Sequence, residues 1–111
     1  MVLFDMVGDC DLEIPREANS DPGLYSTFAD AAQSASGTSE PFEGEAAGIL
    51  DDHTPFLEAG VPAVDLIDFD YGPGPPPGAW WHTRADALEH VCAGSLGEVG
   101  GPALLALRTI G

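Results

Sequence analysis

Carboxylates and histidines gather in two short stretches of this sequence. Asp51, Asp52 and His53 are consecutive, and His82 follows two tryptophans. A further carboxylate, Asp5, follows the apolar residues near the start of the chain. Carboxylates and neutral imidazoles are zinc ligands, and two carboxyl groups can also share a proton for acid-base chemistry. By pattern alone, a loop-capping aspartate and an ordinary packed histidine are the simpler interpretations. The meaning of these residues therefore depends on the elements that position them.

A short helix is expected over residues 54–59, directly after the first stretch. Thr54 is a good N-cap and Pro55 suits the first helical position, while Gly60 suits the left-handed residue beyond a helix end. The N-terminal end of a helix carries partial positive charge, which favours a carboxylate beside it. We therefore expect the two preceding aspartates to face this helix end in a fixed orientation.

A strand and a loop follow this helix and lead to His82. Residues 62–69 form a near-continuous apolar run of strand length, which is typical of a strand covered on both faces in a parallel sheet. Residues 71–79 are rich in glycine and proline, so they predict a surface loop. This order places ionisable groups at the carboxyl end of a sheet, where open α/β folds have their sites.

The motifs, taken together, resemble a known family. Residues 51–63 read Asp-Asp-His-Thr-Pro-Phe-Leu-x-x-Gly-Val-Pro-Ala, and residues 81–86 read Trp-His-Thr-x-x-Asp. Both are similar to the zinc aminopeptidases with co-catalytic metal ions, the family that includes glutaminyl cyclase. Residues 2–8, Val-Leu-Phe-Asp-Met-Val-Gly, resemble the strand of that family that carries a metal-binding aspartate. The resemblance covers nearly the whole chain. It implies a truncated phosphorylase/hydrolase-like fold with three α/β/α layers and a small, mostly parallel sheet.

The resemblance also implies roles for individual residues. Asp5 and His82 match zinc ligands of the two-metal aminopeptidases, although in the cyclases the position of Asp5 belongs to a carboxylate network beside a single zinc. Asp51 matches a catalytic carboxylate of that network, and Trp81 resembles a wall of the substrate pocket or, equally, a core aromatic residue. Zinc is the implied cofactor. Asp52 and His53 are expected to support the motif structurally. Thr83 or a backbone carbonyl is expected to fix the tautomer of His82, and Asp86 to order the loop.

Two motifs of the family are absent from this sequence. An active member has a His-x-Asp motif with a bridging aspartate and a Glu-Glu pair with the general base, both ahead of the strand that matches residues 2–8. The chain contains neither motif, and its histidines are His53, His82 and His90. A two-metal hydrolase needs both a bridging carboxylate and a base. We therefore interpret residues 1–111 as one domain equivalent to the carboxyl-terminal half of a catalytic domain, of metallopeptidase lineage but uncertain activity.

Acidic residues dominate the charge of the chain. Nineteen acidic residues face three arginines and no lysine, which gives a net charge of -16. Such a charge repels nucleic acid and anionic membranes, and high salt would screen its self-repulsion. We interpret the chain as a cytoplasmic protein of a salt-accumulating halophile; the alternative is an acidic protein of an ordinary compartment.

No apolar stretch reaches about 18 residues, so no membrane span is expected. The first residues lack a basic segment, so no signal peptide is expected.

The remaining segments predict alternating strands and helices. Residues 2–7 read as a buried strand, and residues 12–15 as a short extended piece. Asp21 as N-cap and Pro22 open a helix that Gly37 closes.

The second half of the chain adds a weak strand and a terminal helix. Residues 42–50 alternate weakly, which allows a strand or a loop. Residues 100–102 (Gly-Gly-Pro) should weaken or kink the last helix. The expected apolar stripe of that helix consists of Leu96, Val99, Ala103, Leu107 and Ile110. The pattern indicates an α/β three-layer fold with few strands.

The two cysteines, Cys10 and Cys92, leave two alternatives open. They pair if the loop after the first strand meets the start of the last helix, or they stay as free buried thiols of an intracellular protein.

Three classes of function are consistent with these observations. The first is a zinc-binding oligomeric remnant that has lost peptidase chemistry. The second is an aminopeptidase or cyclase whose site another chain completes. The third is a structural or non-functional fragment. Half a sheet leaves a bare edge and apolar surface, so we expect a homodimer through that edge near residues 2–7 or through an apolar face, with a separate amino-terminal half chain as the other partner.

Overall fold

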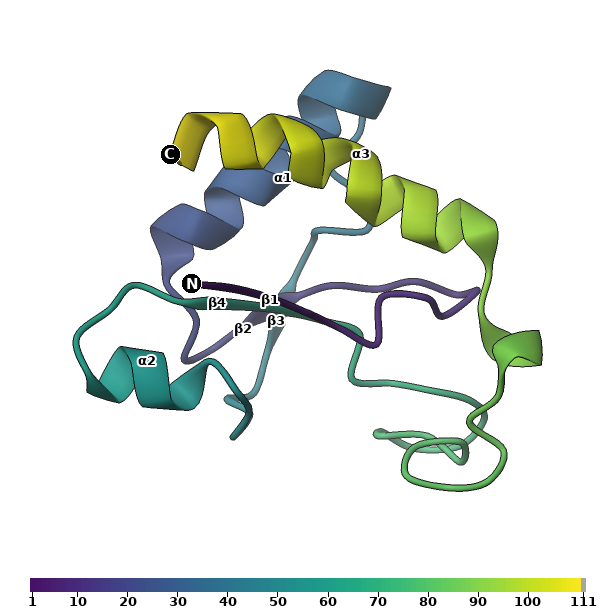
Figure 1. Cartoon of the computed structure of the whole chain (residues 1–111). Helices are drawn as coiled ribbons and strands as arrows, with labels where there is room; N and C mark the ends of the chain where they lie inside the picture. The colour runs from purple at the N-terminus through teal and green to yellow at the C-terminus, as the bar shows by residue number, and fades with distance from the viewer. Residues whose placement is uncertain (111) are drawn as a thin grey trace.

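Two short parallel sheets lie between helices in the computed structural model, which describes residues 1–110. Figure 1 shows α1 and α3 on one face of the strands and α2 on the other. This is the α/β layered arrangement expected from the sequence. In chain order the elements are β1 (Val2–Asp5), β2 (Arg16–Glu17), α1 (Pro22–Ser36), β3 (Glu45–Ala46), α2 (Thr54–Glu58), β4 (Val64–Ile67), the 3-10 helix η1 (Leu88–His90) and α3 (Ala93–Ile110).

The sheet that carries the site consists of β1 and β4, which run parallel. Their register pairs Val2 with Val64 and Asp5 with Ile67. Every residue of β4 is buried, which confirms a strand covered on both faces, although β4 is shorter than the predicted run. Within residues 1–110, β1 pairs only with β4, so its other side is an open edge. Phe4 on this edge strand is 38% exposed.

Helix α1 forms as predicted and carries much of the core. The Asp21 side chain accepts a hydrogen bond from the Leu24 amide, and Gly37 ends the helix with φ +81°. Its Phe28 is fully buried and packs together with Ile14 and Leu66 in the main apolar cluster. Because the capping residues act locally, these two boundaries could be read from the sequence.

Several predicted boundaries were wrong. Thr54 does not cap α2, because its hydroxyl accepts a hydrogen bond from the Asp51 amide (3.2 Å) and the helix already begins at Thr54. Residues 42–50, which the sequence allowed as a strand or a loop, form a strand only at Glu45–Ala46, because Gly44 and Gly48 interrupt the run. The extended piece expected over residues 12–15 lies instead at Arg16–Glu17.

Helix α3 faces the core differently from the prediction. It runs from Ala93 to Ile110 with Pro102 inside it. Only Val99 and Ala103 of the expected stripe are buried, whereas Leu96 and Leu107 are about half exposed. The buried face uses small residues because α3 lies against the alanines Ala31 and Ala32 of α1, where short side chains allow close approach. The buried residues of α3 are Ser95, Val99, Pro102, Ala103 and Ala106.

Searched over residues 1–110, the fold contains no helix that combines the length and the apolar character needed to cross a membrane.

Candidate functional site

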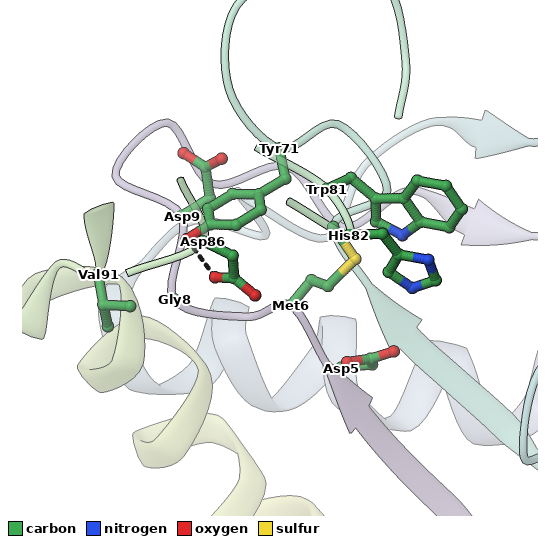
Figure 2. Close-up of a pocket in the computed structure, with 9 residues that line it drawn as sticks. All are labelled: Asp5, Met6, Gly8, Asp9, Tyr71, Trp81, His82, Asp86 and Val91. Atoms are coloured by element: carbon green, nitrogen blue, oxygen red, sulfur yellow. Dashed lines mark hydrogen bonds between the residues drawn. The ribbon is translucent and has the colours of Figure 1, made fainter. Parts of the chain in front are cut away.

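A pocket of about 390 Å³ opens at the carboxyl end of β1. Its walls come from the end of β1 and the turn that follows, from Tyr71, from the loop around residues 81–86 and from Val91 (Figure 2). This volume lies within the range of small-molecule sites, at about 300 to 1,000 Å³. The segments that meet here are separated in sequence and are brought together by the parallel pairing of β1 with β4.

Asp5 and His82 both line this pocket. Asp5 is the last residue of β1. Figure 2 shows the His82 ring on the same side of the pocket as the Asp5 carboxylate. His82 adopts φ +54°, and so does Met6, which also lines the pocket. Residues other than glycine rarely adopt this left-handed backbone conformation, and such backbone strain is often concentrated at functional sites.

The loop that carries His82 is held by aromatic and hydrogen-bonding contacts. The His82 ring stacks on Trp81, with 3.6 Å between ring centroids and 11° between planes. Trp81, the expected pocket wall, lines the pocket and also contacts Phe69 edge to face. The Thr83 hydroxyl donates to the Trp80 carbonyl at 2.9 Å. These contacts fix the backbone that presents His82.

Asp86 orders the same loop from the opposite side of the pocket. The Tyr71 hydroxyl donates a hydrogen bond of 2.9 Å to Asp86, which Figure 2 draws as a dashed line. Behind these residues the loop folds back so closely that a Cβ atom at Gly78 would collide with the Tyr71 carbonyl. Gly78 has φ +87°, so both its conformation and its surroundings require glycine.

The disulfide Cys10–Cys92 joins the two segments that form the far wall of the pocket. Its Cα atoms are 5.0 Å apart. Next to it, the Cys92 amide donates to the Gly8 carbonyl at 2.9 Å, and Asp9 forms an antiparallel bridge with Val91. The structure thus decides between the two alternatives that the sequence left open.

Asp51 lies next to Asp5 without lining the pocket itself. Burial first, and then the Asp51 carboxylate, raise the pKa of Asp5 above its ordinary value. The exposed Asp52 contributes its amide, which donates to the Asp51 side chain at 2.7 Å. The predicted network residue Asp51 therefore lies beside the predicted ligand Asp5 but does not line the pocket.

Sequence reasoning missed two acids that lie beneath this pair. Glu17 and Asp65 are both fully buried, and His53 lies between them. Asp65 had one sequence signal, since it interrupts the apolar run of β4 with a charge. Glu17 had none, because a single acid next to Arg16 is typical of a solvated strand. Burial first, and then the charge of Asp51, raise the pKa of Asp65 to about 7.

The residues present do not make a complete zinc site. Asp5 and His82 supply two donors to one pocket. Within residues 1–110, however, no three or more histidine, cysteine or acidic side chains lie close enough together to hold a metal ion. Catalytic zinc sites have about three protein ligands and structural sites about four. The chain by itself therefore provides part of a ligand set.

We predict that the protein loses stability as pH rises from about 4 to about 7. The pKa of Asp65 is raised to about 7 and that of Asp68 to about 6, mainly by burial, from an ordinary 3.8. Between these values the folded state binds more protons than the unfolded state, so the free energy of unfolding falls with rising pH. Each group contributes up to about 1.4 kcal/mol per pH unit.

Urea unfolding at several pH values measures this slope in wild type and in Asp65→Asn. The variant should show a shallower slope because it lacks one of the groups whose pKa is raised. Glu17 has a lowered pKa and acts in the opposite sense, but only below its ordinary 4.5. Equal slopes in the two proteins would contradict the assignment to Asp65.

Comparison with known proteins gives consistent matches. The sequence profile of peptidase family M28 matches residues 1–106. Among solved structures, a glutaminyl cyclase from an Acidobacteriales bacterium is similar with 39% identity and a TM-score of 0.83, over 98% of this chain and 37% of that one. The Porphyromonas gingivalis glutaminyl cyclase has 28% identity and a TM-score of 0.85, over 99% and 41%.

A leucine aminopeptidase precursor from Bacteroides thetaiotaomicron is similar with 27% identity and a TM-score of 0.77, over 93% of this chain and 35% of that one. No curated protein sequence matches the chain. The chain thus spans about two-fifths of the length of these solved structures or less.

Proposed function

This chain belongs to peptidase family M28, and from that premise we propose that it is a zinc-binding protein whose metal site is shared between chains. The observation that carries the proposal is that Asp5 and His82, far apart in sequence, line one pocket. Since two donors are too few for a stable zinc site, the remaining ligands come from a partner. Residues 1–111 carry two of the metal-binding side chains of such a peptidase site and contain neither a His-x-Asp nor a Glu-Glu motif.

The partner that we propose is a second copy of the chain. In support, β1 presents an open edge within residues 1–110 and carries the partly exposed Phe4. Open edges and apolar surface favour association with another chain. A two-fold interface would bring two copies of each ligand to one assembly. A separate polypeptide with the His-x-Asp and Glu-Glu motifs is the alternative partner.

We predict that the purified protein is a dimer that holds zinc and that His82→Ala removes the zinc. Elemental analysis of zinc per chain and light scattering of the same samples, at low and at molar salt, test this. His90→Ala is the matched control, because His90 stacks on Trp80 and does not line the pocket. Zinc-free wild type under zinc-replete conditions would refute the metal proposal, and a monodisperse monomer at every salt concentration would refute the dimer.

A second candidate function is an active enzyme completed by another chain. The pocket of about 390 Å³ and the 39% identity with a glutaminyl cyclase favour it. Hydrolysis of aminoacyl chromogenic substrates, or cyclisation of an amino-terminal glutamine, at molar salt decides the question. Activity that survives purification and disappears in Asp5→Ala establishes this function. A protein with neither zinc nor activity is a structural fragment.

We also propose that the protein is adapted to high salt, on the evidence of its net charge of -16. A cytoplasmic location stays a prediction, and the Cys10–Cys92 disulfide is more typical of oxidising compartments.

The thermal unfolding midpoint should rise by at least about 5 °C between about 0.1 M and about 2 M NaCl, because salt screens the repulsion among the acidic groups. Calorimetry measures the midpoint. At a pH near the isoelectric point of 4.1 the repulsion vanishes, so the same salt step should have a much smaller effect. An equal effect at both pH values would show that charge screening is not the cause.

A further inference from the structure

His53 lies between two buried acids that come from different strands. Its Nε2 atom is 3.2 Å from Oε2 of Glu17, and its Nδ1 atom is 3.6 Å from Oδ2 of Asp65. All three side chains are 0–1% exposed. Ionisable groups so far from water are costly unless they share protons or hydrogen bonds, so their arrangement requires a specific distribution of protons.

Glu17 is the ionised member of this cluster. Its carboxylate accepts hydrogen bonds from the Asn19 amide (3.0 Å), the Ile49 amide (2.7 Å) and the Ser20 hydroxyl (2.8 Å). Burial opposes its ionisation, but these donors outweigh burial and lower the pKa of Glu17. The contact with His53 then requires a proton on Nε2 of the imidazole, because an ionised carboxylate only accepts.

Asp65 is the member that carries a proton. Within residues 1–110, His53 Nδ1 and both Asp65 carboxyl oxygens are buried and receive no hydrogen bond from an N–H or hydroxyl group. The acids that face Asp65 are Asp51, Asp5 and Glu17, all of which disfavour its ionisation. A carboxyl proton on Asp65 supplies the missing donor, either to Nδ1 of His53 or to Asp51.

Asp51 connects this cluster to the pocket. Its side chain is within hydrogen-bonding reach of both Asp65 and Asp5. Two carboxyl groups form such a bond only when one of them is protonated. A continuous series of polar groups thus runs from Glu17 in the core, through His53 and Asp65, to Asp51 and the pocket.

We propose that Glu17, His53 and Asp65 form a buried positioning unit for Asp51, in which Glu17 fixes the His53 ring with its proton on Nε2 and Asp65 holds a proton between His53 Nδ1 and Asp51. The unit orients the Asp51 carboxylate toward Asp5. It does not touch a ligand in the pocket. The inference rests on the proposed function only for the importance of Asp51, while the geometry of the unit stands without it.

The Asp52 amide reports on this unit because it donates to the Asp51 side chain. In an NMR titration of the full chain from about pH 5 to about pH 9, we expect the Asp52 amide resonance to shift with a midpoint of about 7, the pKa of Asp65. The neutral His53 ring should carry its proton on Nε2. In Asp65→Asn the transition should disappear while the His53 tautomer stays the same.

His90→Gln is the control, since His90 lies outside the unit and should leave the transition unchanged. A transition that persists in folded Asp65→Asn overturns the proposal. A neutral His53 with its proton on Nδ1 in the wild type also overturns it.

His53→Gln gives an independent test if Asp65→Asn does not fold. Glutamine keeps a donor for Glu17 but removes the Nδ1 acceptor, so the midpoint seen at the Asp52 amide should fall. A lower melting temperature with an unchanged midpoint would mean a merely structural role and would overturn the proposal. Zinc analysis of the wild type is read separately, so a failure of the proposed function is distinguishable from a failure of this inference.

Discussion

Replacing both Cys10 and Cys92 with serine lowers the free energy of unfolding by about 4 kcal/mol. The disulfide joins residues 82 positions apart, so it constrains almost the whole unfolded chain. The chain-entropy relation gives about 4.5 kcal/mol for such a loop, and removal of native disulfides from small domains costs about 2 to 5 kcal/mol. A domain of 111 residues has a modest core, so this loss is a large part of its stability.

Urea unfolding of the double variant and of wild type with and without reductant measures the effect. Reduced wild type is the matched control, because it should fall to the stability of the variant. The Cys92 amide, which donates to Gly8, should also exchange its proton faster in the variant, since the disulfide holds that wall of the pocket. Equal stability of oxidised and reduced wild type would contradict a stabilising disulfide.

Replacing Glu17 with alanine lowers the free energy of unfolding by about 3 to 5 kcal/mol, which is the usual cost of breaking a buried charged network. The change removes the acceptor for the Asn19 and Ile49 amides, the Ser20 hydroxyl and the His53 ring at once. Each buried donor left without a partner costs about 1 to 3 kcal/mol. The loss should therefore exceed that of an ordinary surface acid several-fold.

Two controls separate the network from a general effect of charge. Glu89→Ala removes an acid whose side chain is 77% exposed and should change stability by less than about 0.5 kcal/mol. Glu17→Gln keeps an acceptor oxygen and should cost less than the alanine variant. Urea unfolding near neutral pH measures all three. A Glu17→Ala protein as stable as Glu89→Ala would mean that the buried network does not hold the fold.

Features that depend on neighbouring residues were predictable from the sequence. Asp21 and Gly37 mark the ends of α1 correctly, because capping is decided within one helical turn. The apolar run that contains β4 predicted a strand buried on both faces. The motifs around Asp5 and His82 identified the family, which the match over residues 1–106 confirms.

Features that depend on which surfaces meet were not predictable. The sequence did not show whether the large or the small residues of α3 face the core. This depends on the alanines of α1, which pack against the small residues in the fold. Thr54 is a residue type that often caps helices, but in the fold its hydroxyl accepts a hydrogen bond from the Asp51 amide. In both cases a tertiary contact decided between local options of similar energy.

The sequence alone determined the family and most of the order of strands and helices, and it singled out Asp5, Trp81, His82 and Asp86, which line the pocket. Only the tertiary structure decided that Cys10 meets Cys92 and that Glu17 and Asp65 enclose His53. These partners lie on separate elements, so no local pattern records their contact. The sequence does not distinguish a buried acid from a solvated one. An acid becomes buried only when the parallel pairing of β1 with β4 and the packing of the helices exclude water from its side chain.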